Sequence, residues 1–152
     1  MKRIFAILSF SILAIGVIAS NQAMAMTTPN ADVTPGLLCT ADDPNFMGFY
    51  YAEKIARCKR NVGTAEKTQI AAEYGDIPKS EWHNYEFDHL LPLCAGGSDD
   101  IKNLWPQPID EAHLKDRIED EVCLGMSAGT MTQAVAVQKI KDWFDQNSGQ
   151  KH

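Results

Sequence analysis

The stretch that decides the fold runs from Tyr85 to Asp116 and reads YEFDHLLPLCAGGSDDIKNLWPQPIDEAHLKD. It starts with aromatic and apolar residues, stops around Pro92 and passes through Gly96-Gly97. This pattern predicts a short strand over residues 85–93, a wide turn and a second short strand. A helix is predicted over residues 110–123. Because a two-stranded ribbon is marginal alone, this helix has to pack against it.

Two further helices are predicted on either side of this stretch. The first begins at Thr64, carries apolar residues at helical spacing and ends at Gly75, beyond which Pro78 blocks continuation. The second runs from Met131 to about residue 144, with Thr130 as its N-cap. Helices beside a small ribbon give an α+β fold.

The beginning of the chain has the order of parts of a secretory signal peptide. Lys2 and Arg3 precede an apolar run over residues 4–19, and Ala23-Met24-Ala25 follows. The run is shorter than the ~20 residues of a membrane span, so we expect a signal peptide over residues 1–25. We then expect a flexible leader over residues 26–36, a single domain over residues 37–148, no membrane attachment after cleavage, and a periplasmic or secreted product.

Export bears on the four cysteines, which all lie in the expected domain. An even number of cysteines in an oxidising compartment favours two disulfides. Four cysteines allow three pairings, and the order of the segments favours Cys39–Cys58 with Cys94–Cys123. Each bond closes a loop that would contribute ~3 kcal/mol.

The net charge opposes simple electrostatic binding of nucleic acid. The whole chain carries a formal charge of −6, and removal of Lys2 and Arg3 leaves 12 basic against 20 acidic residues. Acidic proteins repel phosphate polymers at long range. Binding therefore has to rest on a local basic surface, and the segment from Tyr50 to Arg60 offers aromatic and basic residues, although its aromatic side chains could equally be core.

Residues 88–116 contain the groups that phosphodiester hydrolysis needs. His89 is a candidate general base, and Asp88 and Asp116 are candidate ligands of a divalent cation. Asn103 is a candidate for holding the base in position, or for stabilising a turn. Such oxygen and nitrogen donors suit magnesium, manganese, nickel or zinc. Asp88 and His89 point to opposite faces of a regular strand, so the strand has to end or bulge there.

The combination of Asp88-His89, Pro92, Gly96-Gly97 and Asn103-Leu104 resembles the motif of the His-Asn-His (HNH) endonucleases, over residues 85–123. The resemblance implies a ββα-metal fold with one divalent ion, with Asp88 as a metal ligand and His89 as the general base. It also implies cleavage to 3′-hydroxyl and 5′-phosphate ends.

The chain departs from that motif at its third element. Family members place a histidine nine residues after the asparagine, whereas this chain has Ala112 there. Either Asp116 or His113 would then complete the metal site. Lys115 is a candidate for binding the substrate phosphate, although charges on a helix face are commonly only solvated.

The sequence therefore predicts an exported, metal-dependent endonuclease that cuts DNA and possibly RNA. The alternative is a non-catalytic secreted module that keeps the scaffold without the complete metal shell.

Overall fold

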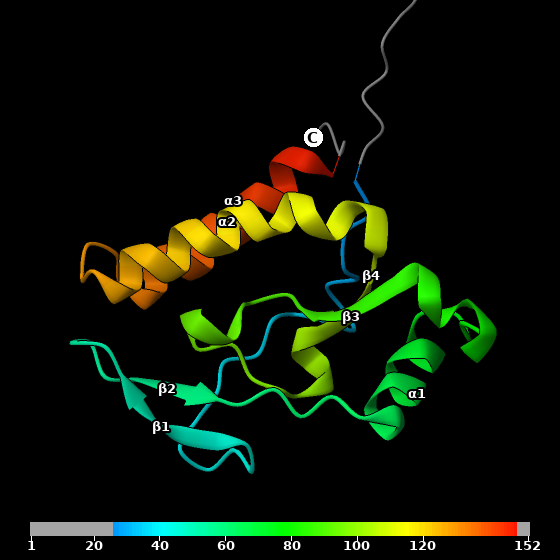
Figure 1. Ribbon diagram of the computed structural model, residues 1–152, viewed down its shortest axis with the longest axis horizontal. Helices are drawn as coiled ribbons and strands as arrows, with labels where there is room; N and C mark the ends of the chain where they lie inside the picture. Colours follow the sequence, from blue (N-terminus) through cyan, green and yellow to red (C-terminus); the bar gives the residue numbers. More distant parts are fainter. Residues whose placement is uncertain (1–25, 149–152) are drawn as a thin grey trace, which may run out of the picture.

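The computed structural model describes residues 26–148, so the expected signal peptide lies outside the described residues. Its helices and strands follow one another along the chain (Figure 1) as β1 (Phe46–Tyr50), β2 (Ile55–Cys58), α1 (Thr64–Glu73), η1 (Lys79–Asn84), β3 (Tyr85–His89), η2 (Leu93–Ala95), η3 (Ile101–Asn103), β4 (Leu104–Pro108), α2 (Ile109–Ser127) and α3 (Gln133–Asn147). The α+β class predicted from the sequence is confirmed.

A ribbon of two antiparallel strands, β3 and β4, lies at the centre of the described chain. Its register pairs Asp88 with Trp105 and His89 with Leu104. Helix α2 follows β4 directly, so the predicted order of strand, turn, strand and helix is present. Strand β3 ends at His89, four residues earlier than predicted. Helix α2 is longer than predicted at both ends.

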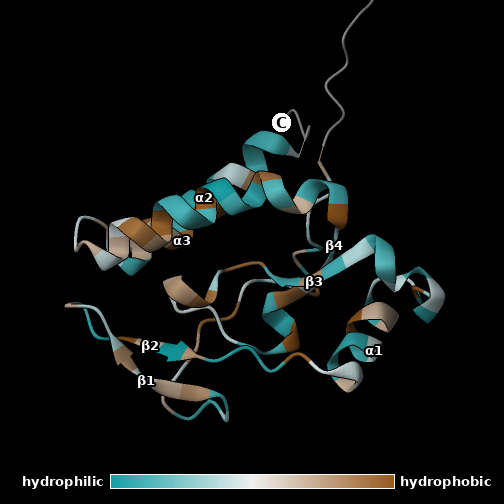
Figure 2. Cartoon of the chain, viewed as in Figure 1, coloured by the Kyte–Doolittle hydropathy of each residue, from teal (hydrophilic) through white to brown (hydrophobic). Residues whose placement is uncertain are grey.

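The two faces of the ribbon pack against different helices. The pair α2 and α3 covers one face, where Trp105 is fully buried (Figure 1). Helix α1 covers the other face, where Ile70 packs with Phe87 and Leu104. Apolar and polar residues alternate along α2 and α3 (Figure 2), as expected for helices with one buried side. The two faces of the ribbon thus belong to two separate hydrophobic clusters.

The N-terminal aromatic and basic stretch forms a hairpin of β1 and β2. Tyr51 and Lys54 in its turn have positive φ angles. Arg57 lies over the ring of Tyr50 at 4.7 Å, so this cation is already engaged with an aromatic face. Phe49 is 61% exposed, whereas Ile55 is buried. Phe46, Tyr50 and Tyr51 are half-buried, so no aromatic side chain of this hairpin is fully in the core.

Both predicted disulfides are confirmed. Cys39–Cys58 joins the N-terminal segment to β2, and Cys94–Cys123 joins η2 to α2. They link residues that are 19 and 29 positions apart in the sequence. The second bond fixes α2 against the loop that follows β3.

Residues 26–36, which we expected to form a flexible leader, instead pack along the domain. The backbone N–H of Met26 donates to Asn147 O and that of Gly36 to Lys102 O. Thr34 is 1% exposed and donates from its hydroxyl to Leu104 O at 3.0 Å. Tyr74 then donates to the Thr34 hydroxyl at 2.7 Å. Composition suggested a leader because the segment has few apolar residues, but its polar groups bond to the core.

The start of α3 also differs from its prediction. Thr132, rather than Thr130, is the N-cap, and its hydroxyl accepts from Val135 N. Thr130 instead bonds to Gly125 O in the turn after α2. The helix ends at Asn147, three residues later than predicted. Helix α1, by contrast, begins at Thr64 as predicted. Gly75 adopts a left-handed conformation just beyond the end of that helix.

Replacing Thr34 with valine should lower the free energy of unfolding by about 1–2 kcal/mol, because Leu104 O and the Tyr74 hydroxyl lose a buried partner. Urea unfolding followed by circular dichroism measures the difference. The exposed Thr40→Val variant is the control. Equal stability of both variants would show that residues 26–36 contribute little to folding.

Candidate functional site

His89 lies at the last position of β3 with only 4% of its side chain exposed. Its Nε2 is 2.9 Å from Asp99 Oδ1, and its Nδ1 is 3.1 Å from Arg60 Nη1. A carboxylate accepts and a guanidinium donates. The Nε2 atom therefore carries the proton, and the lone pair of Nδ1 faces Arg60.

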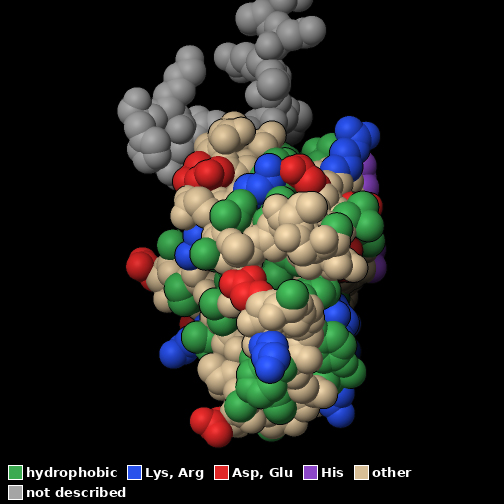
Figure 3. All heavy atoms as spheres, turned by 90° about the vertical axis from the view of Figure 1, so that its left-hand side faces the viewer, with side chains coloured by type: hydrophobic (Ala, Val, Ile, Leu, Met, Phe, Trp, Pro, Cys, Tyr) green, Lys and Arg blue, Asp and Glu red, His purple; other side chains and the backbone are tan. Residues whose placement is uncertain are grey.

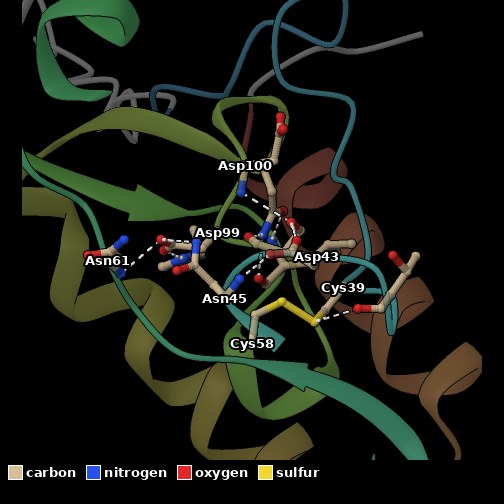
Figure 4. The surroundings of a disulfide bond; sticks show 12 residues. Cys39, Asp43, Asn45, Cys58, Asn61, Asp99 and Asp100 are labelled. Atoms are coloured by element: carbon tan, nitrogen blue, oxygen red, sulfur yellow. Dashed lines mark hydrogen bonds and ion pairs between the residues drawn. A yellow bond between two sulfur atoms is a disulfide. The ribbon is translucent and has the colours of Figure 1, made fainter. Parts of the chain in front are cut away.

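Asp99 is held in place from several directions (Figure 4). Its Oδ2 accepts from the backbone N–H of Asn61 at 2.8 Å and from Asn45 Nδ2 at 3.4 Å. Next to it, Ser98 donates to Asp43 Oδ2 at 2.7 Å. Asp43 and Asn45 lie in the segment closed by Cys39–Cys58, and Asn61 follows it by three residues, so the first disulfide helps to fix the carboxylate that orients His89.

Arg60 connects three groups along β3. Its guanidinium donates to Phe87 O at 2.6 Å, faces His89 Nδ1, and lies 3.5 Å from Asp88 Oδ1. Its side chain is 43% exposed. Arg60 is thus the cation of this cluster that has direct access to solvent, and it covers the basic nitrogen of His89.

Asn103 is fully buried and holds the loop between the two strands together. Its Oδ1 accepts from Leu91 N at 2.9 Å, and its Nδ2 donates to Leu91 O and to Ser98 O. The Leu90 N–H donates to Asn103 O. Gly97 is required nearby because a side chain at this position would collide with Leu91 O. Of the two roles considered for Asn103, these contacts are those of a residue that stabilises the turn.

On the other face of β3, Asp88 points towards α2 and meets Lys115. Lys115 Nζ donates to Asp88 Oδ2 at 2.6 Å, to His89 O at 2.5 Å and to Glu119 Oε1 at 2.5 Å. An ammonium has three protons, so all three donors have partners. The side chain is 1% exposed. Lys115, expected to contact a substrate phosphate, is instead buried between the ribbon and the helix.

The pKa directions agree with a charged network. Burial alone would raise the pKa of Asp88, but attraction to Lys115 and their hydrogen bond bring it below the ordinary value. Burial would lower the pKa of Lys115, but Asp88 and Glu119 raise it above the ordinary value. For Glu119, burial and repulsion from Asp88 outweigh Lys115 and raise the pKa. Lys115 is therefore an ammonium at neutral pH.

The two candidates for the third metal ligand, His113 and Asp116, are both exposed on α2. Lys115 and Glu119 are one helical turn apart on the buried side of α2, whereas His113 and Asp116 are rotated away from it. Within residues 26–148, no hydrogen bond or ion pair joins either residue to Asp88 or His89. The carboxylate of α2 that lies near Asp88 is instead that of Glu119, and Lys115 donates to both.

The oxygens around Asp88 do not form an open metal site, because Lys115 already occupies their centre. A second group of potential ligands, Cys39, Asp43 and Cys58, lies within 4.8 Å. The two sulfur atoms of that group are bonded to each other, so they offer no thiolate to a metal. Neither group fits the divalent ion implied by the HNH resemblance.

The surface gives no large basic area on the face that Figure 3 displays. Acidic and basic side chains are interspersed there. Within residues 26–148, no helix has the length and apolar character needed to cross a membrane.

Comparison with known proteins adds no assignment: no family model, curated protein or solved structure matches this chain.

Sequence reasoning missed Asp99, and it placed Arg60 in a candidate nucleic-acid-binding segment but not beside His89. Asp99 belongs to the Gly-Gly-Ser-Asp-Asp stretch, where a carboxylate directly after a tight turn was a signal for a partner of His89. Arg60 lies 29 residues before His89, and it reaches the ribbon only through the fold of the N-terminal segment. No local pattern predicted that contact.

Replacing Asn103 with alanine should destabilise the protein by about 3 kcal/mol, because it leaves Leu91 N, Leu91 O and Ser98 O without their partner. Thermal and urea unfolding measure the loss. Asn84→Ala, an exposed position next to β3, is the matched control. A loss no larger than that of the control would contradict the role given to Asn103.

The Asp88–Lys115 pair should produce a specific acid dependence of stability. A lowered carboxyl pKa contributes stability that is complete above the ordinary value of 3.8 and is lost as the pH falls through the lowered value. The difference in unfolding free energy between the wild type and Asp88→Asn should therefore stay constant above about pH 5 and shrink as the pH falls below it. The exposed Asp116→Asn variant should show a smaller dependence. A difference that stays constant with pH would contradict the charge pairing.

Proposed function

We propose that this protein is an exported phosphodiester hydrolase of the HNH type that cuts nucleic acid, with His89 as its general base. The single observation that carries the proposal is the environment of the His89 imidazole at the end of β3. Asp99 fixes the proton on Nε2, and the lone pair of Nδ1 is directed towards a solvent-accessible cation. The order β3, β4 and α2 and the motif residues of the resemblance support the same proposal.

In the proposed reaction, Nδ1 of His89 takes a proton from an attacking water. The water oxygen forms a bond to phosphorus, the bond from phosphorus to the departing sugar oxygen breaks, and that oxygen takes a proton from solvent. Asp99 stabilises the imidazolium that forms. The products are a 3′-hydroxyl and a 5′-phosphate, as the resemblance implies.

Arg60 is the residue that we expect to hold the scissile phosphate. In the structure its guanidinium covers Nδ1 of His89, and its exposed side chain has to move for a water to enter. A planar guanidinium can bind two phosphate oxygens at once and stays charged at every physiological pH. Movement of Arg60 from His89 to a phosphate would open the base and place substrate beside it in one step.

Export is part of the proposal and rests on two observations. The first 25 residues have the pattern of a signal peptide, and both disulfides are formed in the described domain. Disulfides of this kind persist in the periplasm or outside the cell.

A non-catalytic binding module remains the second candidate, and the closure of the site favours it. His89 is 4% exposed and Arg60 blocks its basic nitrogen. This candidate predicts binding of nucleic acid without cleavage.

Purified oxidised protein should convert supercoiled plasmid DNA to nicked circles, and His89→Ala should reduce the rate about 10²- to 10⁴-fold, because it removes the base. His83→Ala, an exposed histidine bonded to Ser80 O, should leave the rate unchanged. The assay is repeated with RNA. Absence of cleavage of either polymer by folded protein would reject the enzyme in favour of the binding module.

A further inference from the structure

The contacts of Lys115 lead to an inference about the charge of this site. In a metal-dependent HNH centre, a divalent ion would lie between the first motif carboxylate and a ligand from the helix. Here the ammonium of Lys115 lies between Asp88 of β3 and Glu119 of α2, within 2.6 Å of an oxygen from each. A third oxygen, His89 O, belongs to the same residue as the proposed base.

We propose that Lys115 together with Arg60 takes the place of the divalent metal ion, so that this centre holds its own positive charge and works without a metal. Asp88 lies between the two cations: Oδ2 contacts Lys115 Nζ at 2.6 Å, and Oδ1 lies 3.5 Å from Arg60 Nη1. The two side chains carry the same total charge as one divalent ion. The inference deepens the proposed function, and its consequence for cleavage rests on that function.

A metal ion has no room beside Lys115. Divalent ions bind oxygen ligands at ~2.0–2.6 Å. An ion that used the oxygens of Asp88, Glu119 and His89 would therefore lie where the Nζ atom is, or in contact with it. Two cations at that distance repel each other strongly in a buried site.

Displacement of Lys115 by a metal is also opposed by the fold. The lysine side chain is 1% exposed and crosses the interface between β3 and α2. Helix α2 cannot move away freely, since Cys123, two turns beyond Lys115, is bonded to Cys94.

The two cations have different tasks. Lys115 is buried and has all three protons engaged, so it acts as a positioning residue that holds Asp88 and the end of β3 against α2. Arg60 is 43% exposed and is the cation that a phosphate can reach. The buried cation fixes the geometry, and the exposed cation meets the substrate.

Manganese titration by calorimetry tests the inference without reference to activity. We compare the wild type, Asp88→Asn, Lys115→Ala and the double variant Lys115→Ala/Asp88→Asn, with Lys141→Ala, an exposed helical lysine, as the control. The wild type, Asp88→Asn and Lys141→Ala should show no saturable site. Lys115→Ala should gain one manganese site, formed by the oxygens that the ammonium leaves, and the double variant should lose it.

Two results would overturn the inference. One is a stoichiometric manganese site in the wild type that Asp88→Asn abolishes. The other is a folded Lys115→Ala protein that binds no manganese, since the three oxygens would then not form a cation site. If Lys115→Ala does not fold, the wild type and Asp88→Asn still test the inference, because neither protein lacks Lys115. A manganese site present in the first and absent from the second would overturn it.

Plasmid nicking in EDTA provides the second measurement. The wild type should keep its full rate in EDTA and should gain nothing from added magnesium, manganese, nickel or zinc. Cleavage abolished by EDTA and restored by metal would overturn the inference while leaving the nuclease intact. No cleavage in any condition, with no metal site in the titration, would reject the proposed function while the replacement of the metal by Lys115 stands.

Discussion

The arrangement of the centre depends on one buried charge, the ammonium of Lys115, which joins β3 to α2. Its three hydrogen bonds reach the side chain of Asp88, the backbone of His89 and the side chain of Glu119. Removing one partner of a buried ion pair lowers the free energy of unfolding by about 3–5 kcal/mol, because the other charge stays in the interior without compensation. The position of β3 relative to the helix, and thus the position of the proposed base, follows from this contact.

The opposite face of β3 depends on a different part of the chain. His89 bonds to Asp99, and Asp99 accepts from the backbone of Asn61, which follows the disulfide-bonded β2. The N-terminal segment lies outside the stretch that resembles the HNH motif, yet it supplies both the arginine beside His89 and the bonds that hold its carboxylate partner. Figure 4 shows Cys39–Cys58 near Asp43, Asn45 and Asp99. The segment is therefore part of the site and more than a covering of the core.

These two faces explain how neighbouring residues of one strand serve one centre. Asp88 and His89 leave the ribbon on opposite sides, as successive residues of a regular strand do, but at the end of β3 Asp88 Oδ1 lies only 4.0 Å from His89 Nδ1. Because β3 ends at His89, the guanidinium of Arg60 reaches around its edge and contacts both side chains. A cation at the strand edge thus connects the carboxylate on one face to the imidazole on the other.

The sequence alone determined the α+β class, the order of strand, turn, strand and helix, both disulfides and the start of α1. Each of these follows from local patterns, such as glycine and proline positions, helical spacing and the cysteine count. Tertiary structure decided which polar groups meet. Residues 26–36 have few apolar residues and still pack on the domain, since Thr34 forms buried hydrogen bonds to the core. The surroundings of Lys115 could not be predicted from the sequence either, because a lysine on an amphipathic helix is normally solvated. Its burial is favourable only because Asp88 of β3 lies beside it.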